Sequence, residues 1–285
     1  MQITKEQVKN WSACTDGYRW FLEKFPQGGA YADVHGALMT DKRFDDARWL
    51  VDKMYRTFLD SAEFIKAETA ATDQMTKELT SVESPSDVAE GENNSGDYAR
   101  IGSSGDYAKI GSSGYYAQIG SSGDYAQIGS SGDYAQIGSS GDYAQIGSSG
   151  YSARIGSSGD YARIGSSGDY SRIGSSGYSA RIGSSGDYAQ IGSSGDYAQI
   201  GSSGDYAQIG SSGDYAQITA SGKNAVVACA GSVKRIVLGE GGCVAVPWHD
   251  GERTRFAVAY VGENDIEADT PYCLNDEGKF VKIVE

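Results

Sequence analysis

An isoleucine recurs at every ninth position through the middle of the chain. Fourteen isoleucines from Ile101 to Ile218 keep this spacing, and the unit Gly-Ser-Ser-Gly-Asp-Tyr-Ala-Gln-Ile barely varies between them. In residues 107–110 (Tyr-Ala-Lys-Ile), apolar and polar positions alternate as they do in a β-strand. The Gly-Ser-Ser-Gly segment supplies turn residues, because glycine tolerates a positive φ and serine hydroxyls cap backbone groups. Short strands and turns at a fixed period predict a β-solenoid rather than a flexible linker.

Two nonapeptides are expected to form one turn of this solenoid. Nine residues are too few to close a coil, whereas 18 residues can form two short strands that belong to two parallel sheets. Ala and Ile would fill a thin core, while Tyr and the neighbouring Gln or Arg would point outward from two flat faces. Degraded units at 222–227 and Ile236 extend the array. The prediction is about eight turns stacked at about 4.8 Å, which gives a rod roughly 40 Å long.

The flanking segments have other patterns. Residues 1–80 carry apolar residues at helical spacing, residues 81–94 show no periodicity and are interpreted as a linker, and residues 237–285 alternate as short strands. Both flanks are interpreted as end caps, which stacked repeats need. The predicted fold is therefore mainly β: an N-terminal helical domain (1–80), a parallel nonapeptide β-solenoid with two units per 18-residue coil (95–236) and a small C-terminal β cap (237–285).

Three segments of the chain carry a resemblance to known sequences. Residues 13–17 (Ala-Cys-Thr-Asp-Gly), followed by Phe21 and Phe25, resemble a short helical N-terminal module of uncharacterised phage and bacterial repeat proteins. The nonapeptide array resembles their central solenoid, and residues 239–244 and 272–281 resemble their C-terminal cap. The resemblance implies a prophage or mobile-element setting and carries no catalytic motif.

The net charge of the chain limits the classes of molecule that it can bind. The chain has 24 Lys and Arg against 38 Asp and Glu, a net charge of −14, which argues against direct binding to nucleic acid or anionic lipid. The first ten residues lack the apolar stretch of a signal peptide, and no long apolar run predicts a membrane span. The expectation is a cytoplasmic protein with a protein partner. A homodimer is compatible with the sequence.

Candidate chemistry is sparse. With two His and four Cys, the latter without metal-ligand spacing, no metal or cofactor is predicted. His249 lies among acidic residues in 248–252, where a polar loop between two strands is favoured over an active site, so no enzyme is predicted. The repeated Asp would stack along the rod, and stacked carboxylates need a cation, Ser hydroxyls or backbone N–H groups. The calcium-binding nonapeptide pattern is absent, which favours the last two partners.

The candidate partner surface lies in the middle of the array, where four consecutive units carry Arg in place of Gln. With two units per coil, Arg154 and Arg172 should share one sheet and Arg163 and Arg181 the other. Tyr and Arg are enriched at binding hot spots, and nearby Asp or a partner would have to compensate the stacked cations. Changing all four Arg to Gln is predicted to spare folding and weaken binding. The predicted surface also contains Tyr161, Tyr170, Asp160 and Asp169.

Three functions follow from these features. The first is a non-catalytic acidic binding module, encoded by a phage or mobile element, that acts as an anti-defence inhibitor by occupying a nucleic-acid-binding surface. The second is a structural protein that binds ice or another lattice through flat Tyr ladders. The third is an enzyme built on the C-terminal cap around His249, which is supported only by the types of residue present there.

Overall fold

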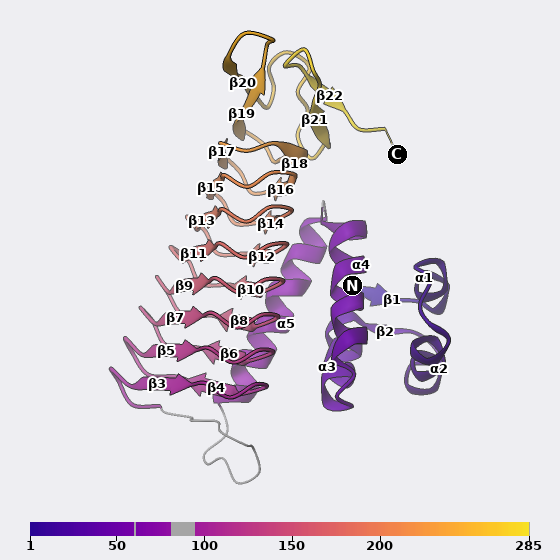
Figure 1. The fold of residues 1–285 in the computed structure, drawn as a ribbon, viewed down its shortest axis with the longest axis vertical. Coiled ribbons are helices and arrows are strands. Elements are labelled where there is room, and N and C mark those ends of the chain that lie inside the picture. The colour runs from indigo at the N-terminus through magenta and orange to yellow at the C-terminus, as the bar shows by residue number, and fades with distance from the viewer. Residues whose placement is uncertain (60, 81–94, 285) are drawn as a thin grey trace.

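The computed structural model describes residues 1–59, 61–80 and 95–284, and its centre is a parallel β-solenoid (Figure 1). Successive strands alternate between two ten-stranded sheets, so that each strand pairs in register with the strand 18 residues away. The predicted fold class and the two-unit coil are confirmed. One sheet, here called the covered sheet, consists of β4 (Lys109–Ser112), β6 (Gln127–Ser130), β8 (Gln145–Ser148), β10 (Arg163–Ser166), β12 (Arg181–Ser184), β14 (Gln199–Ser202), β16 (Ala216–Ala220), β18 (Val233–Leu238), β21 (Tyr272–Leu274) and β22 (Phe280–Lys282).

The opposite sheet, here called the open sheet, is built in the same way. Its ten strands are β3 (Arg100–Ser103), β5 (Gln118–Ser121), β7 (Gln136–Ser139), β9 (Arg154–Ser157), β11 (Arg172–Ser175), β13 (Gln190–Ser193), β15 (Gln208–Ser211), β17 (Val226–Cys229), β19 (Cys243–His249) and β20 (Thr254–Tyr260). In each repeat strand the Ile and the final Ser point inward, and the Gln or Arg and the Gly point outward. The core between the sheets is therefore a thin layer of Ile, Ala and Ser, as predicted.

The tyrosines lie in the turns and not on the sheet faces, which corrects the prediction of Tyr-lined faces. Tyr107 and its equivalents adopt a left-handed backbone, with φ of 61° at Tyr107, whereas the turn glycines do not. That conformation costs a bulky residue roughly 1–2 kcal/mol. It is held because the Tyr107 N–H donates to the carbonyl oxygen of Asp124 in the next coil, at 2.8 Å. The aromatic rows consequently follow the two edges of the rod.

Each aromatic row is continuous along its edge. Tyr170 and Tyr188 stack with ring centroids 4.9 Å apart, and this stacking repeats from coil to coil. Where Ser152 interrupts the row, Tyr151 from the preceding position fills the gap with its ring 5.3 Å from that of Tyr170. Tyr178 does the same beside Ser179, with its ring 5.3 Å from that of Tyr197. The exchange of Asp-Tyr for Tyr-Ser therefore preserves aromatic packing at the cost of one carboxylate.

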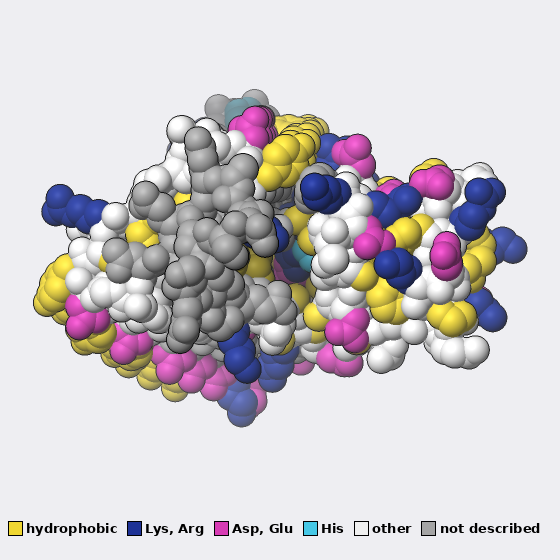
Figure 2. Space-filling view, turned by 90° about the horizontal axis from the view of Figure 1, so that it is seen from below, with side chains coloured by type: hydrophobic (Ala, Val, Ile, Leu, Met, Phe, Trp, Pro, Cys, Tyr) yellow, Lys and Arg dark blue, Asp and Glu magenta, His cyan; other side chains and the backbone are white. Residues whose placement is uncertain are grey.

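The Asp side chains bind the backbone of the next coil. The Oδ1 atom of Asp124 accepts the N–H of Asp142 at 2.9 Å, and the same bond repeats along both edges. This confirms the prediction that turn N–H groups satisfy the carboxylates, while a Ser hydroxyl takes part at Ser232 with Asp214. Figure 2 shows acidic side chains gathered in a row along an edge of the rod.

The helical module lies along the side of the rod (Figure 1), and its interpretation as an end cap is wrong. It contains β1 (Gln2–Ile3), α1 (Lys5–Asn10), α2 (Thr15–Lys24), β2 (Gly29–Ala30), α3 (Tyr31–Thr40), α4 (Phe44–Phe58) and α5 (Ala62–Thr80). Helix α5 crosses the covered sheet from β14 to β4, and α3 and α4 pack on α5 with their own apolar core. No described helix has both the length and the hydropathy needed to span a membrane.

The C-terminal strands continue both sheets at the far end of the rod. Strand β19 still pairs in parallel with β17, and β20 returns antiparallel to it. Strand β21 pairs antiparallel with β18, followed by β22. Antiparallel strands end the parallel stacking, which supports the expectation of a small β cap on this side.

Candidate functional site

Helix α5 can approach the covered sheet closely because the sheet presents a row of glycines. Each strand places a Gly beside its Gln or Arg on the outer face, and these glycines are buried beneath α5. A Cβ on Gly165 would lie 2.1 Å from the Oγ1 atom of Thr72, and one on Gly147 would lie 2.6 Å from that of Thr76. The helix advances about 5.4 Å per turn and the coils about 4.8 Å each. Small Thr side chains one turn apart therefore fit successive glycines.

A buried ion pair anchors this contact. Arg163 of β10 is 5% exposed and Glu68 of α5 is 1% exposed. The Nε and Nη2 atoms of Arg163 donate to the two carboxylate oxygens of Glu68, the second at 2.7 Å. Nη2 also donates to the Tyr31 hydroxyl at 3.1 Å, and Nη1 lies 2.8 Å from Nε2 of His35. The Tyr55 hydroxyl of α4 also donates to Glu68, at 3.3 Å. The carboxylate therefore accepts hydrogen bonds from the covered sheet and from the helical module.

Burial sets the protonation states in this network. It lowers the pKa of His35 well below its usual value, helped by the Arg163 charge, so the neutral ring can accept from Arg163. Burial raises the pKa values of Tyr31 and Tyr55 well above the usual range, and both hydroxyls stay protonated. Burial alone would lower the pKa of Arg163, but the Glu68 carboxylate raises it above its usual value. The network therefore holds one cation and one anion in neutral surroundings.

Two further contacts seat the module. Arg181 of β12 donates from Nη2 to Asp52 of α4 at 2.7 Å. At the edge of the rod, the guanidinium of Arg48 lies 5.1 Å from the ring centroid of Tyr143. The middle of the covered sheet is thus bound by the chain itself.

The structure divides the predicted partner surface into two halves. Arg163 pairs in register with Arg181, and Arg154 with Arg172 on the opposite sheet, as predicted. Arg163 and Arg181 are buried by the helical module and are not available to a partner in this structure. Because both are paired with carboxylates of the helical module, we no longer expect that changing these two to Gln would spare folding. Arg154 and Arg172 are exposed, and no described residue supplies them with a carboxylate.

The other predicted residues lie on the edges. The Oδ1 atom of Asp160 accepts from the N–H of Tyr178, and that of Asp169 from the N–H of Asp187, both at 2.8 Å. They do not compensate the arginines. Tyr161 stacks on Tyr143 next to the module, and Tyr170 is exposed in the opposite aromatic row. The predicted surface is thus not one continuous patch.

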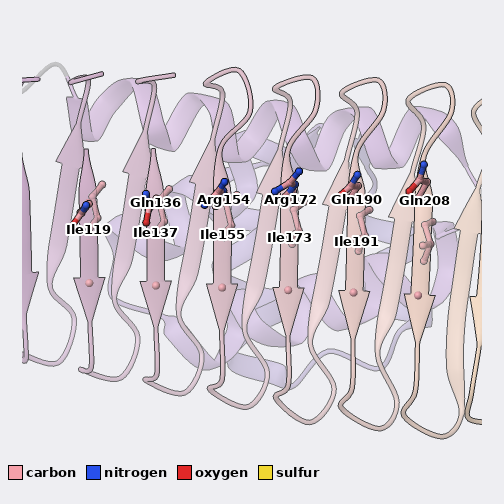
Figure 3. Close-up of a pocket in the computed structure, with 18 of the residues that line it drawn as sticks. Ile119, Gln136, Ile137, Arg154, Ile155, Arg172, Ile173, Gln190, Ile191 and Gln208 are labelled. Carbon is pink, nitrogen blue, oxygen red and sulfur yellow. The ribbon is translucent and has the colours of Figure 1, made fainter. Parts of the chain in front are cut away.

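The open sheet carries a long groove lined by the same residue types as the covered sheet. Its volume is about 1480 Å³, and a Cβ added to Gly156 or Gly174 would meet no atom within 4 Å. Figure 3 shows the outward row across successive strands, namely Gln136, Arg154, Arg172, Gln190 and Gln208. In the described part of the chain, no element covers on this sheet the surface that α5 fills on the other.

An apolar patch extends the open sheet toward the C-terminus. Strand β20 exposes Phe256 (61%), Val258 (51%) and Tyr260 (51%), which alternate with buried alanines. Their register partners on β19 and the exposed Val226 of β17 belong to the same outer face. The open sheet thus offers a glycine groove, the exposed Arg154 and Arg172 near its middle, Arg100 at its N-terminal end, and an apolar end.

The C-terminal cap does not form a comparable site among the residues that the structure describes. The loop after His249 is a polar hairpin turn, as favoured from the sequence: Asp250 accepts backbone N–H groups of Arg253 and Glu252, which with Arg255 lower its pKa to about 2. Within the described ranges, no three His, Cys, Asp or Glu side chains are grouped to hold a metal ion.

Sequence reasoning missed the acidic partners on the helices, Glu68 and Asp52. A usable signal was present in residues 65–76, where Ile65, Thr69, Thr72 and Thr76 recur at helical spacing. A stripe of Thr is too polar to stand out as a core-facing stripe, because hydrophobic patterns identify burial only against apolar surfaces.

Comparison with known proteins covers the N-terminal module. A family model described as the YdhT N-terminal domain matches residues 1–59. A curated protein of Escherichia coli (strain K12), "Uncharacterized protein YdhT", is 54% identical over 50 residues, which is 18% of this chain and 18% of the relative's own length. No solved structure matches the chain. The resemblance to an uncharacterised family is confirmed for the module, while a phage or prophage setting stays a prediction.

Proposed function

We propose that this protein is a non-catalytic scaffold that binds a protein partner on its open sheet. One observation carries the proposal: the chain presents the same surface twice, and one of the two is already a protein-binding surface. On the covered sheet, Gly165 receives Thr72, and Arg163 receives Glu68. On the open sheet Arg154, Arg172 and Gly174 are exposed and Gly156 is half-buried. Two stacked cations without a carboxylate are unfavourable by themselves, and an acidic partner would relieve them.

The finer hypothesis of a phage-encoded anti-defence inhibitor gains no geometric support. A mimic of nucleic acid needs carboxylates that project toward its target. Here the Asp carboxylates bind turn N–H groups, and the broad open face carries Arg154 and Arg172. Lattice binding through Tyr-lined faces loses its basis as well, because the tyrosines line the edges.

A site-specific photocrosslinker tests the proposal. Benzoylphenylalanine at Gln190 lies on the outer face of the open sheet, beside the row of glycines and not on it. The same group at Ser176, in the exposed turn after β11, is the matched control. Irradiation in the native host should give an adduct of discrete mass at position 190 and not at 176. Equal adducts at both positions, or none at 190, would show that the open sheet is not a binding surface.

A further inference from the structure

The covered sheet shows which shape of ligand the repeat surface selects. Helix α5 lays Ile65 over Gly201, Thr72 over Gly165 and Thr76 over Gly147. Each contact brings a side chain of the helix against bare strand backbone. A strand or an irregular loop would not keep this one-contact-per-coil spacing, whereas a helix matches it with one turn per coil.

The groove on the open sheet is long enough for a helix of the size of α5. Its row of glycines runs from Gly102 to Gly210 in steps of 18 residues. Six coil steps correspond to about 29 Å, and a helix of 19 residues such as α5 is about 28 Å long. The groove can therefore accept a helix of the length that the covered sheet accepts.

Charge and hydropathy give the ligand a direction and a composition. Arg154 and Arg172 lie in the middle of the groove, at positions equivalent to the Arg163 and Arg181 that bind Glu68 and Asp52. The apolar patch of Phe256, Val258 and Tyr260 lies toward the C-terminal end of the same sheet. On the covered sheet, helix α5 has its apolar and polar residues in the same order along the rod. Its Ile65 lies near β14, and its Thr72 and Thr76 lie toward β8.

We infer that the ligand of the open sheet is an amphipathic α-helix of the partner protein. It carries Thr, Ser or Ala at i, i+3 and i+4 spacing along the contact face. A carboxylate near its middle pairs with Arg154 or Arg172, and its large apolar residues lie at the end of the groove next to the exposed Val226 of β17. A second copy packed face to face would bring its own Arg154 and Arg172 against these cations. This inference rests on the proposed function and specifies the chemistry of the partner.

The probe is a labelled synthetic peptide of residues 62–80, held helical by a hydrocarbon staple between positions 66 and 70, which α5 exposes to solvent. It is titrated into the full chain, where the tethered α5 retains the covered sheet because its effective concentration is far higher. Saturable one-to-one binding is expected. The double variant R154Q/R172Q of the protein, or Glu68→Gln in the peptide, should weaken binding by about tenfold or more.

Two further variants keep the result interpretable. Gly156→Val with Gly174→Val fills the groove without a clash in the strand and should abolish binding. Lys109→Gln removes an exposed cation from the covered sheet and should leave binding unchanged. Failure of the peptide to bind, or binding insensitive to the groove variants, overturns the helical ligand.

A separate readout distinguishes the two proposals. An adduct from the crosslinker at position 190 without peptide binding would keep the open sheet as a binding surface and reject the helix. Absence of both would reject both. A concentration-dependent dimer in sedimentation that disappears in Gly174→Val would show that a second copy occupies the face, which also overturns the helical ligand.

Discussion

Arg163→Gln is the sharpest test of how the helical module is held on the rod. Gln occupies this position in most repeats, including Gln145 on the adjacent strand β8, so the strand itself accepts it. The substitution removes the guanidinium that binds both oxygens of Glu68. Arg172→Gln makes the same chemical change one repeat later on the open sheet, where the side chain is exposed. The chain thus provides its own matched control.

The expected loss follows from burial. Glu68 is 1% exposed, and removing one partner of a buried ion pair costs about 3–5 kcal/mol because the other charge stays desolvated. The Tyr55 hydroxyl still donates to the carboxylate, and a neutral hydrogen bond from the new Gln would offset about 1 kcal/mol. A net loss of about 3 kcal/mol is therefore expected for Arg163→Gln. The loss for Arg172→Gln should stay within about 0.5 kcal/mol, as for other surface substitutions.

Urea denaturation separates the two parts of the molecule. Trp11, Trp20 and Trp49 lie in the module, and the fourth tryptophan, Trp248, lies in β19. In a Trp248→Phe background, tryptophan fluorescence therefore reports the unfolding of the module, while far-ultraviolet circular dichroism reports the β-signal of the solenoid. With a slope of about 1–3 kcal/mol per M, the fluorescence midpoint of Arg163→Gln should fall by about 1–3 M. The double variant R163M/E68M should recover most of the loss, because it buries no charge. Equal midpoints for Arg163→Gln and Arg172→Gln would refute the ion pair as an anchor.

Three other substitutions, with Gly174→Ala as a matched control, test the packing and the buried network. Gly165→Ala should destabilise docking of the module by about 1–3 kcal/mol, since its Cβ would lie 2.1 Å from Oγ1 of Thr72. Gly174→Ala on the open sheet should be neutral or stabilise the protein by up to about 1 kcal/mol. Equal denaturation midpoints for the two variants would contradict this. Gly168→Ala should cost about 3 kcal/mol or more in thermal melts followed by circular dichroism, because its Cβ would lie 2.0 Å from a backbone carbonyl oxygen of the preceding coil; an unchanged melting temperature would be inconsistent with the stacking. Because the folded-state pKa of His35 is lowered, the unfolded chain binds the extra proton, so stability should be full above about pH 6.5 and fall as the pH decreases below it. His35→Gln should remove that component of the unfolding profile between pH 5 and 8, and an identical pH profile in the variant would argue against it.

The periodic sequence alone determined the solenoid, its 18-residue coil and the inward Ile and Ala. These features are local, because each unit carries the same alternation and nine residues set the spacing of Ile101 to Ile218. The division of the four arginines between two sheets followed from the same period. The conformation of the tyrosines did not, because a left-handed Tyr is locally unfavourable and is imposed by hydrogen bonds from the next coil.

Only the tertiary structure decided which sheet is covered and which is open. The two faces have nearly the same residues, so nothing within the repeats distinguishes them. The difference comes from contacts across about 95 residues of chain, chiefly between Glu68 and Arg163, which no local pattern encodes. These contacts turn two of the four arginines into an internal anchor and leave Arg154 and Arg172 exposed. The physical reason is that a buried carboxylate needs a cation, and that a closely packed helix needs strand positions without side chains. On the covered sheet the module contacts both.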